Sequence, residues 1–334
     1  MKLSKIFITG AALIALFGFV SCSKKNASEK KVKIGIAKIV QHVALDSIEQ
    51  GIIDYLNENG VNAQYDLQNA NGDANTASQI ALKYKDEGVD VAVGIATPVA
   101  LALANTIKDI PVVFGTITDP LGAGLVTTLE HGEGNVTGMS DAIPVEQHLA
   151  MFKEIAGIKT LGYIYTSSEA NSVSSLKLVK SACDKLGINL VTQSITNSSE
   201  VKQAAETIVP RVDGIYLTTD NTVFSALSSL VQVFEGAKKP IFSADVTGAK
   251  EGGCLIAYGF NYYKAGRATG EIVLKILNGA KPSEIPIRFM TEPSDSDLLL
   301  DLDAAKNCGI TIPQKYLSAA NMIFETGVLS SIKK

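Results

Sequence analysis

Short β-branched runs alternate with segments of helical periodicity along most of this chain, and this alternation constrains its fold more than any other feature. Strands that alternate with helices form parallel sheets whose faces are covered by the helices. We therefore predict an α/β fold. The expected strands are residues 32–38, 62–68, 89–95, 111–116, 160–165, 189–194, 214–218, 240–243 and 254–258.

The expected helices lie between these strands, and glycines follow several of them, where a left-handed cap residue is favoured. They are residues 45–59, 75–87, 97–107, 145–155, 171–186 and 223–234. A polar, glycine-bearing stretch at 130–141 separates two sets of strands, which predicts two doubly wound lobes at 32–141 and 142–264. The tail at 265–334, with the end of a helix at 262–277 and a helical piece at 301–307, is expected to cross back between the lobes and supply further hinge strands. Its lobe membership stays open.

The N-terminus has the layout of a bacterial lipoprotein signal. Lys2 and Lys5 precede an apolar run at 6–20 that ends at Ser21 and Cys22. This run is shorter than the roughly 20 apolar residues of a membrane-spanning helix. We predict that residues 1–21 are removed, that Cys22 is lipidated, and that 22–31 form a flexible tether. An ordinary cleaved signal with a coincidental cysteine is the alternative.

Composition and missing motifs exclude several classes of protein. The net charge is −4 and basic residues form no stripe, so nucleic acid is not an expected partner. The chain has no GxSxG elbow, no P-loop and no GxGxxG after its first strand, so we expect no enzyme and no cofactor. Scattered histidines without paired spacing predict no metal site. The odd set Cys183, Cys254 and Cys308 predicts buried or semi-buried thiols.

Polar residues follow strand after strand, at the edge where open parallel sheets bind ligands. Each also has an alternative interpretation as a helix cap, and Thr97 is expected to cap its helix with Pro98 at the first helical position. Six such turns in one exported chain favour a cleft for a zwitterion, with hydroxyls and helix-start amides for a carboxylate and acids for an ammonium. His42 is interpreted as a candidate cleft-rim residue. Candidates for an aromatic wall, with core packing as the alternative, are Phe114, Tyr165, Tyr216 and Tyr258.

Several of these turns carry longer and more specific motifs. They are GIATPVALALAN (94–105), FGTITDPLGAGLV (114–126), GNVTGMSDAIPVEQ (134–147), SEANSV (168–173), YLTTDNTV (216–223) and YGFNYYKAGRATGEI (258–272). With these motifs the chain resembles, from 32 to about 323, the ABC transporter substrate-binding protein family whose characterised members include binders of tryptophan and other aromatic amino acids.

The resemblance implies a type I periplasmic-binding-protein fold, in which two doubly wound parallel-sheet lobes are joined by hinge strands. It implies an extracytoplasmic receptor that closes over one solute and delivers it to an ABC permease and ATPase complex. The predicted lipid on Cys22 would anchor this receptor to the membrane, and a monomer is the default expectation. An aromatic amino acid is the first expected ligand. The alternatives are another solute, such as a branched-chain amino acid or a nucleoside, and a sensory binding lipoprotein.

Site residues carried over by motif position divide between the two lobes. Thr97, Thr116 and Ser140 are expected to face the cleft from the first lobe. Those expected from the second lobe are Ser168, Asn171, Ser172, Asp220 and Asn221. Asp245 is added, although residues 243–248 depart from the acidic, glycine-led form that the family implies.

Overall fold

The computed structural model describes residues 31–332 of the chain. The predicted signal and the lipidation at Cys22 therefore lie outside the described residues. Within 31–332, no helix combines the length and the apolarity that crossing a membrane requires.

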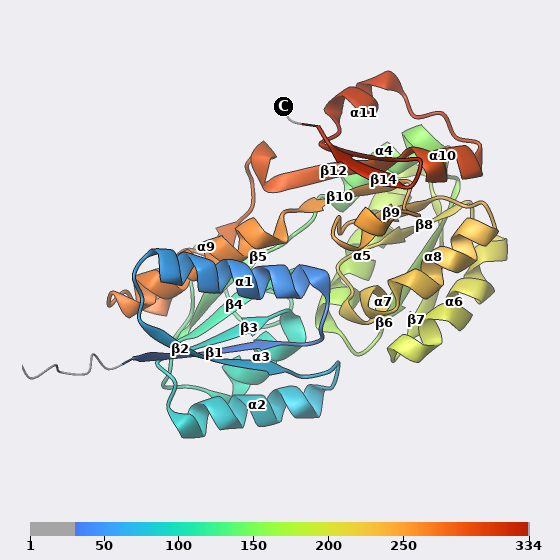
Figure 1. The fold of residues 1–334 in the computed structure, drawn as a ribbon. Coiled ribbons are helices and arrows are strands. Elements are labelled where there is room, and N and C mark those ends of the chain that lie inside the picture. The colour runs from blue at the N-terminus through green and yellow to red at the C-terminus, as the bar shows by residue number, and fades with distance from the viewer. Residues whose placement is uncertain (1–30, 333–334) are drawn as a thin grey trace, which may run out of the picture. The chain divides into compact units, whose positions relative to one another are not determined.

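The first sheet has six strands in the order β11-β5-β4-β3-β1-β2, all parallel (Figure 1). Its strands are β1 (Val32–Lys38), β2 (Ala63–Asn69), β3 (Val91–Ile95), β4 (Val112–Ile117), β5 (Val136–Ser140) and β11 (Arg288–Phe289). Two pairs of helices cover its faces. One pair is α1 (Val43–Glu58) with α9 (Tyr262–Leu277), and the other is α2 (Ala74–Glu87) with α3 (Thr97–Thr106).

The second sheet has eight strands in the order β14-β13-β12-β10-β9-β8-β6-β7. Its strands are β6 (Thr160–Thr166), β7 (Asn189–Ile195), β8 (Gly214–Leu217), β9 (Ile241–Ser243), β10 (Ile256–Phe260), β12 (Ser296–Asp301), β13 (Met322–Glu325) and β14 (Val328–Ser331). The strands from β7 to β10 are parallel, whereas β12 is antiparallel to β10. The remaining helices are α4 (Val145–Ala156), α5 (Ala170–Leu186), α6 (Val201–Ile208), α7 (Asn221–Ser225), α8 (Leu227–Gly236), α10 (Leu302–Cys308) and α11 (Gln314–Ala319).

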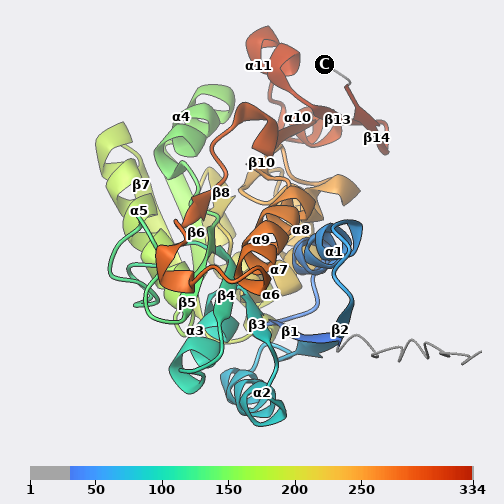
Figure 2. The same cartoon turned by 90° about the vertical axis from the view of Figure 1, so that its left-hand side faces the viewer.

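The chain crosses between the two sheets at 141–144, at Asn261 and at 290–295. Helix α9 therefore follows a strand of the second sheet but packs beside α1 on the first, as Figures 1 and 2 show. Glycines allow this close approach. A Cβ added at Gly51 would lie 2.4 Å from the Tyr263 carbonyl oxygen, and one added at Gly266 would lie 2.2 Å from that of Ile48.

Two sequence predictions about these elements were wrong. The stretch 130–141, expected to be a polar separator, contains β5, whose five residues are all buried. One of its polar side chains finds a partner beside the sheet, since the Thr137 hydroxyl donates at 3.1 Å to the carbonyl oxygen of Ile285, which precedes β11. The helix expected at 223–234 is two helices, α7 and α8, that meet at Ala226.

The prediction of buried or semi-buried thiols is confirmed. Cys183 and Cys254 are buried and Cys308 is half-buried. Burial raises the pKa of the Cys183 thiol to about 11 and that of Cys254 to about 12. At neutral pH both are therefore protonated and unreactive.

Candidate functional site

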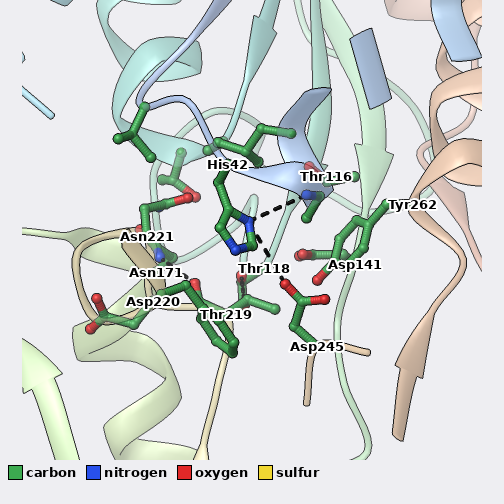
Figure 3. Close-up of a pocket in the computed structure, with 16 residues that line it drawn as sticks. His42, Thr116, Thr118, Asp141, Asn171, Thr219, Asp220, Asn221, Asp245 and Tyr262 are labelled. Carbon is green, nitrogen blue, oxygen red and sulfur yellow. Dashed lines mark hydrogen bonds and ion pairs between the residues drawn. The ribbon is translucent and has the colours of Figure 1, made fainter. Parts of the chain in front are cut away.

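A pocket that is partly open to solvent lies where the carboxyl ends of the strands of both sheets meet (Figure 3). This is where open α/β sheets place ligands. Its lining consists of Val40, His42, Ala44, Leu45, Ala96, Thr97, Thr116, Thr118, Asp141, Asn171, Thr219, Asp220, Asn221, Phe224, Asp245 and Tyr262. No Lys or Arg belongs to this lining, and residues 31–332 contain no cluster of potential metal ligands.

The first lobe contributes two strained turns. Ala96 and Thr116 have φ values of +71° and +57°, a conformation that costs non-glycine residues roughly 1–3 kcal/mol and is found at functional sites. Ala96, rather than Thr97, is the N-cap of α3, so the predicted cap was wrong by one residue. The Ala96 N–H donates to the Gly115 carbonyl oxygen at 3.2 Å, which ties the start of α3 to β4. The Ala96 side chain cannot cap α3, and Ala96 and Thr97 at the start of this helix line the pocket.

His42 lines the pocket from the start of α1. Its Nδ1 accepts a hydrogen bond from the Ala44 N–H at 3.3 Å and lies 3.9 Å from Asp245 Oδ2. Its ring lies 5.8 Å from the Phe224 ring, centroid to centroid. Asp46, one turn further along α1, pairs with Lys38 at 2.7 Å instead. His42 therefore contributes an aromatic face to the pocket, and the carboxylate beside it is that of Asp245 rather than that of Asp46.

Two buried carboxylates, those of Asp141 and Asp245, line the pocket near His42. Asp141 is 3% exposed, and its Oδ1 has no hydrogen-bond partner among the described residues. Burial, with Asp245 nearby, raises the pKa of Asp141 to about 6. Asp245 Oδ1 accepts from the amide and hydroxyl of Thr247 at 2.7 and 2.6 Å, and burial raises its pKa although His42 opposes the shift. Both carboxylates line a pocket that has no Lys or Arg, and His42 lies within ion-pair distance of Asp245.

Asp220 lines the pocket, but all its oxygens are already engaged. Its Oδ1 accepts from the Thr166 hydroxyl at 2.8 Å and from the Val223 N–H at 3.0 Å. Its Oδ2 accepts from the Thr166 N–H at 2.7 Å and from the Ser172 hydroxyl at 2.6 Å. Asp220 therefore joins the ends of β6, α5 and α7, and Ser172 supports it from behind the lining.

Glu169 holds the two asparagines of the pocket and was missed in the sequence. Its Oε2 accepts from the side-chain amide groups of Asn171 and Asn221 at 3.2 and 2.6 Å. Its Oε1 accepts from the Thr222 N–H at 3.0 Å. Glu169 is the N-cap residue of α5, yet its carboxylate caps α7, a helix that begins 52 positions later in the chain. Local sequence carries no signal for such a contact.

Most of the predicted site residues line the pocket, namely Thr97, Thr116, Asn171, Asp220, Asn221 and Asp245. Three lie elsewhere. Ser140 is buried in β5 and accepts from the Ala142 N–H at 3.3 Å, Ser168 is exposed in the turn before α5, and Ser172 supports Asp220. None of the four aromatic-wall candidates lines the pocket, and two of them, Phe114 and Tyr216, are core residues. The aromatic side chains that line the pocket are those of Phe224, Tyr262 and His42.

Direct contacts join the two lobes beside the pocket. The Thr118 and Thr219 hydroxyl oxygens lie 3.0 Å apart, and the Ser174 hydroxyl donates to Asp119. Both bonds connect the segment after β4 to the second lobe. The pocket is therefore enclosed by both lobes in this structure.

Comparisons with known proteins agree on one family. Its profile, described as ABC transporter substrate binding protein, matches residues 33–323. The "Tyrosine-binding protein" of Clostridioides difficile (strain R20291) is 33% identical over 305 residues, which is 90% of this chain and 86% of that protein.

Two solved structures differ in how well they superpose. An ABC domain from Streptococcus pneumonia in complex with L-Trp is 34% identical, with a TM-score of 0.84 over 88% of this chain and 100% of that one. A ligand-free, open substrate-binding protein with adhesive properties from Clostridium difficile is 37% identical, with a TM-score of only 0.64 over 84% and 96%. The structure is thus more similar to the L-Trp complex, although the open protein is slightly closer in sequence.

Proposed function

This chain belongs to the ABC transporter substrate-binding protein family, and on that premise we propose that its pocket binds one aromatic amino acid for import. The fold is that of a type I periplasmic binding protein, and the family is one of solute receptors rather than enzymes. The observation that carries the proposal is the chemistry of the lining. Two buried carboxylates, Asp141 and Asp245, lie in the same pocket as the start of α3, and no Lys or Arg lines this pocket.

A zwitterion matches these two features. The proposed ammonium site is Asp141 with Asp245, because a buried carboxylate is stable when a cation and hydrogen-bond donors reach it. The proposed carboxylate site is the start of α3 with the Thr97 hydroxyl. Backbone amides and the helix dipole attract an anion there without a basic side chain.

The apolar part of the lining suits an aromatic ring. Phe224, His42 and Tyr262 supply aromatic faces, and Val40 and Leu45 supply aliphatic ones. Aromatic rings favour offset or edge contacts with such faces. The names of a tyrosine-binding relative and of a related L-Trp complex support the same ligand class.

The proposed mechanism is closure of the two lobes over the ligand. A ligand that contacts both lobes favours the closed state by its differential affinity for that state. The interlobe bonds at Thr118 and Ser174 and the higher TM-score with the L-Trp complex support this structure as the closed form. We propose that the permease and ATPase complex receives the ligand from this form.

Calorimetry tests which ligand the pocket binds. The purified protein is first unfolded and refolded, so that any ligand retained from the cells is removed. Tyrosine, tryptophan and phenylalanine are titrated beside leucine and a nucleoside. The chain contains no Trp, so a change in indole emission during the tryptophan titration reports the ligand alone. We expect saturable 1:1 binding by at least one aromatic amino acid. Saturable binding by leucine or the nucleoside alone would contradict the proposal.

Substrate-binding proteins of ABC transporters act outside the cytoplasm, and we propose that this one is a monomer held at the membrane by a lipid on Cys22. The basic residues, the apolar run and the final Ser21 support this proposal. Labelling with a fatty-acid probe tests it. Cys22→Ala should abolish labelling, whereas the matched variant Cys308→Ala should keep it. Undiminished labelling of Cys22→Ala would refute the anchor.

A further inference from the structure

The side-chain oxygen of Asn171 is a buried acceptor that no donor of the described chain reaches. Asn171 is 3% exposed, and its amide nitrogen donates to the Thr219 carbonyl oxygen at 3.0 Å and to Glu169 Oε2 at 3.2 Å. A backbone carbonyl oxygen can only accept, so the amide cannot be rotated by 180° without setting two acceptors against each other. The orientation is therefore fixed, with Oδ1 left over.

Glu169 makes this orientation rigid. Its carboxylate also accepts from Asn221 and Thr222, so it is held by α7 while it holds Asn171 on α5. An acceptor fixed in this way and left unpaired is costly unless something else supplies the donor. Because Asn171 lines the pocket, the bound ligand can supply it.

Asn171 lies at the opposite side of the pocket from the proposed ammonium site. In Figure 3, Asn171 and Asn221 lie on one side of His42, whereas Asp141 and Asp245 lie on the other. A ligand whose ammonium is at the two carboxylates therefore directs its other end past His42 toward Asn171. A donor for Asn171 must then come from the ring.

We propose that Asn171 Oδ1 accepts a hydrogen bond from the ligand's ring, so that the pocket selects aromatic amino acids that carry a ring donor. The phenol O–H of tyrosine and the indole N–H of tryptophan provide this donor, and phenylalanine has none. A site built to hydrogen-bond a polar group discriminates strongly against the analogue that lacks it, because its own buried group stays unpaired. This inference rests on the proposed function and assigns Asn171 as the specificity residue, with Glu169 as its positioning residue.

The test compares ligand affinities in the wild-type protein and two variants by calorimetry. The wild-type protein should bind tyrosine at least about tenfold more tightly than phenylalanine. Asn171→Ala should weaken the binding of tyrosine by about the same factor and leave the affinity for phenylalanine nearly unchanged. The ratio of the two affinities should therefore fall toward one. Asn59→Ala, an exposed asparagine on α1's C-terminal end, is the control and should keep the wild-type ratio.

A second measurement needs no variant. 4-Fluorophenylalanine is close to tyrosine in size but has no ring donor, so the wild-type protein should bind it as weakly as phenylalanine. Equal wild-type affinities for tyrosine and phenylalanine would overturn the inference while leaving an aromatic amino acid receptor. Equal weakening of both ligands by Asn171→Ala would overturn it too, since the amide would then receive the ammonium. Absence of binding by every aromatic amino acid would overturn the proposed function as well.

Discussion

Replacing Asp220 with alanine should destabilise the ligand-free protein much more than replacing Asp73, although each aspartate caps a helix. Asp73 is exposed, and its Oδ1 accepts from the Thr76 N–H at the start of α2. Asp220 caps α7 in the same way, but it is 1% exposed and accepts three further hydrogen bonds from Thr166 and Ser172. The two variants therefore share the loss of a cap and differ in the loss of the buried bonds.

The expected magnitudes follow from these contacts. Loss of an N-cap costs about 1 kcal/mol, which is the whole expected effect of Asp73→Ala. Each hydrogen bond to a charged group contributes about 1.5–3 kcal/mol. Ser172 keeps its own bond to the Thr166 N–H at 2.9 Å, and both hydroxyls can rotate to other acceptors, so the losses do not add fully. We expect about 4 kcal/mol for Asp220→Ala, within the range for removing one partner from a buried charged network.

Urea denaturation followed by far-ultraviolet circular dichroism gives the free energies of unfolding by linear extrapolation. The difference between the two variants should be about 3 kcal/mol, the part attributed to the buried bonds. Values within 1 kcal/mol of each other would refute the reasoning. A stable Asp220→Ala protein that had lost ligand affinity would refute it differently, because the carboxylate would then contact the ligand rather than the turns.

Three further changes test other parts of the structure. Affinity for the aromatic amino acid, measured by calorimetry, should fall about tenfold from pH 7.5 to pH 5, because Asp141, with its pKa raised to about 6, becomes protonated and no longer neutralises the ammonium. Asp141→Asn should show a smaller fall, to which Asp245 still contributes because burial raises its pKa too, and a flat wild-type profile would contradict the assignment. Ser174→Ala removes the hydrogen bond from Ser174 to Asp119 between the lobes, so the radius of gyration measured by X-ray scattering should increase in the ligand-free protein and stay unchanged in the ligand-bound protein. An unchanged radius in the ligand-free protein would argue against a role of this bond in holding the lobes closed. Gly51→Ala should cost about 3 kcal/mol in urea denaturation because its Cβ meets the α9 backbone, whereas Gly236→Ala, with open space around it, should be nearly neutral; equal effects would disprove the close approach.

Much of the fold could be predicted from local sequence. The predicted strand at 32–38 and helix at 262–277 agree residue for residue with β1 and α9, because apolar periodicity and flanking cap residues act over a few positions. β5 was missed because its burial comes from its place between β4 and β11, which local pattern does not contain. The antiparallel pairing of β12 with β10 and the packing of α9 against α1 likewise depend on where the chain crosses between the sheets, and local sequence does not contain this information.

The sequence by itself determined which polar residues follow the strands, and in parallel sheets this is enough to bring Thr97, Thr116, Asn171 and Asp220 toward one pocket. Only the tertiary structure decided which of their atoms are free. Asp220 is engaged by groups 48 and 54 positions away, whereas Asn171, oriented by Thr219 48 positions away, is left with an unpaired oxygen. Residue type states what an atom can bind, but its partners come from other strands and helices, so the tertiary structure decides what remains for the ligand.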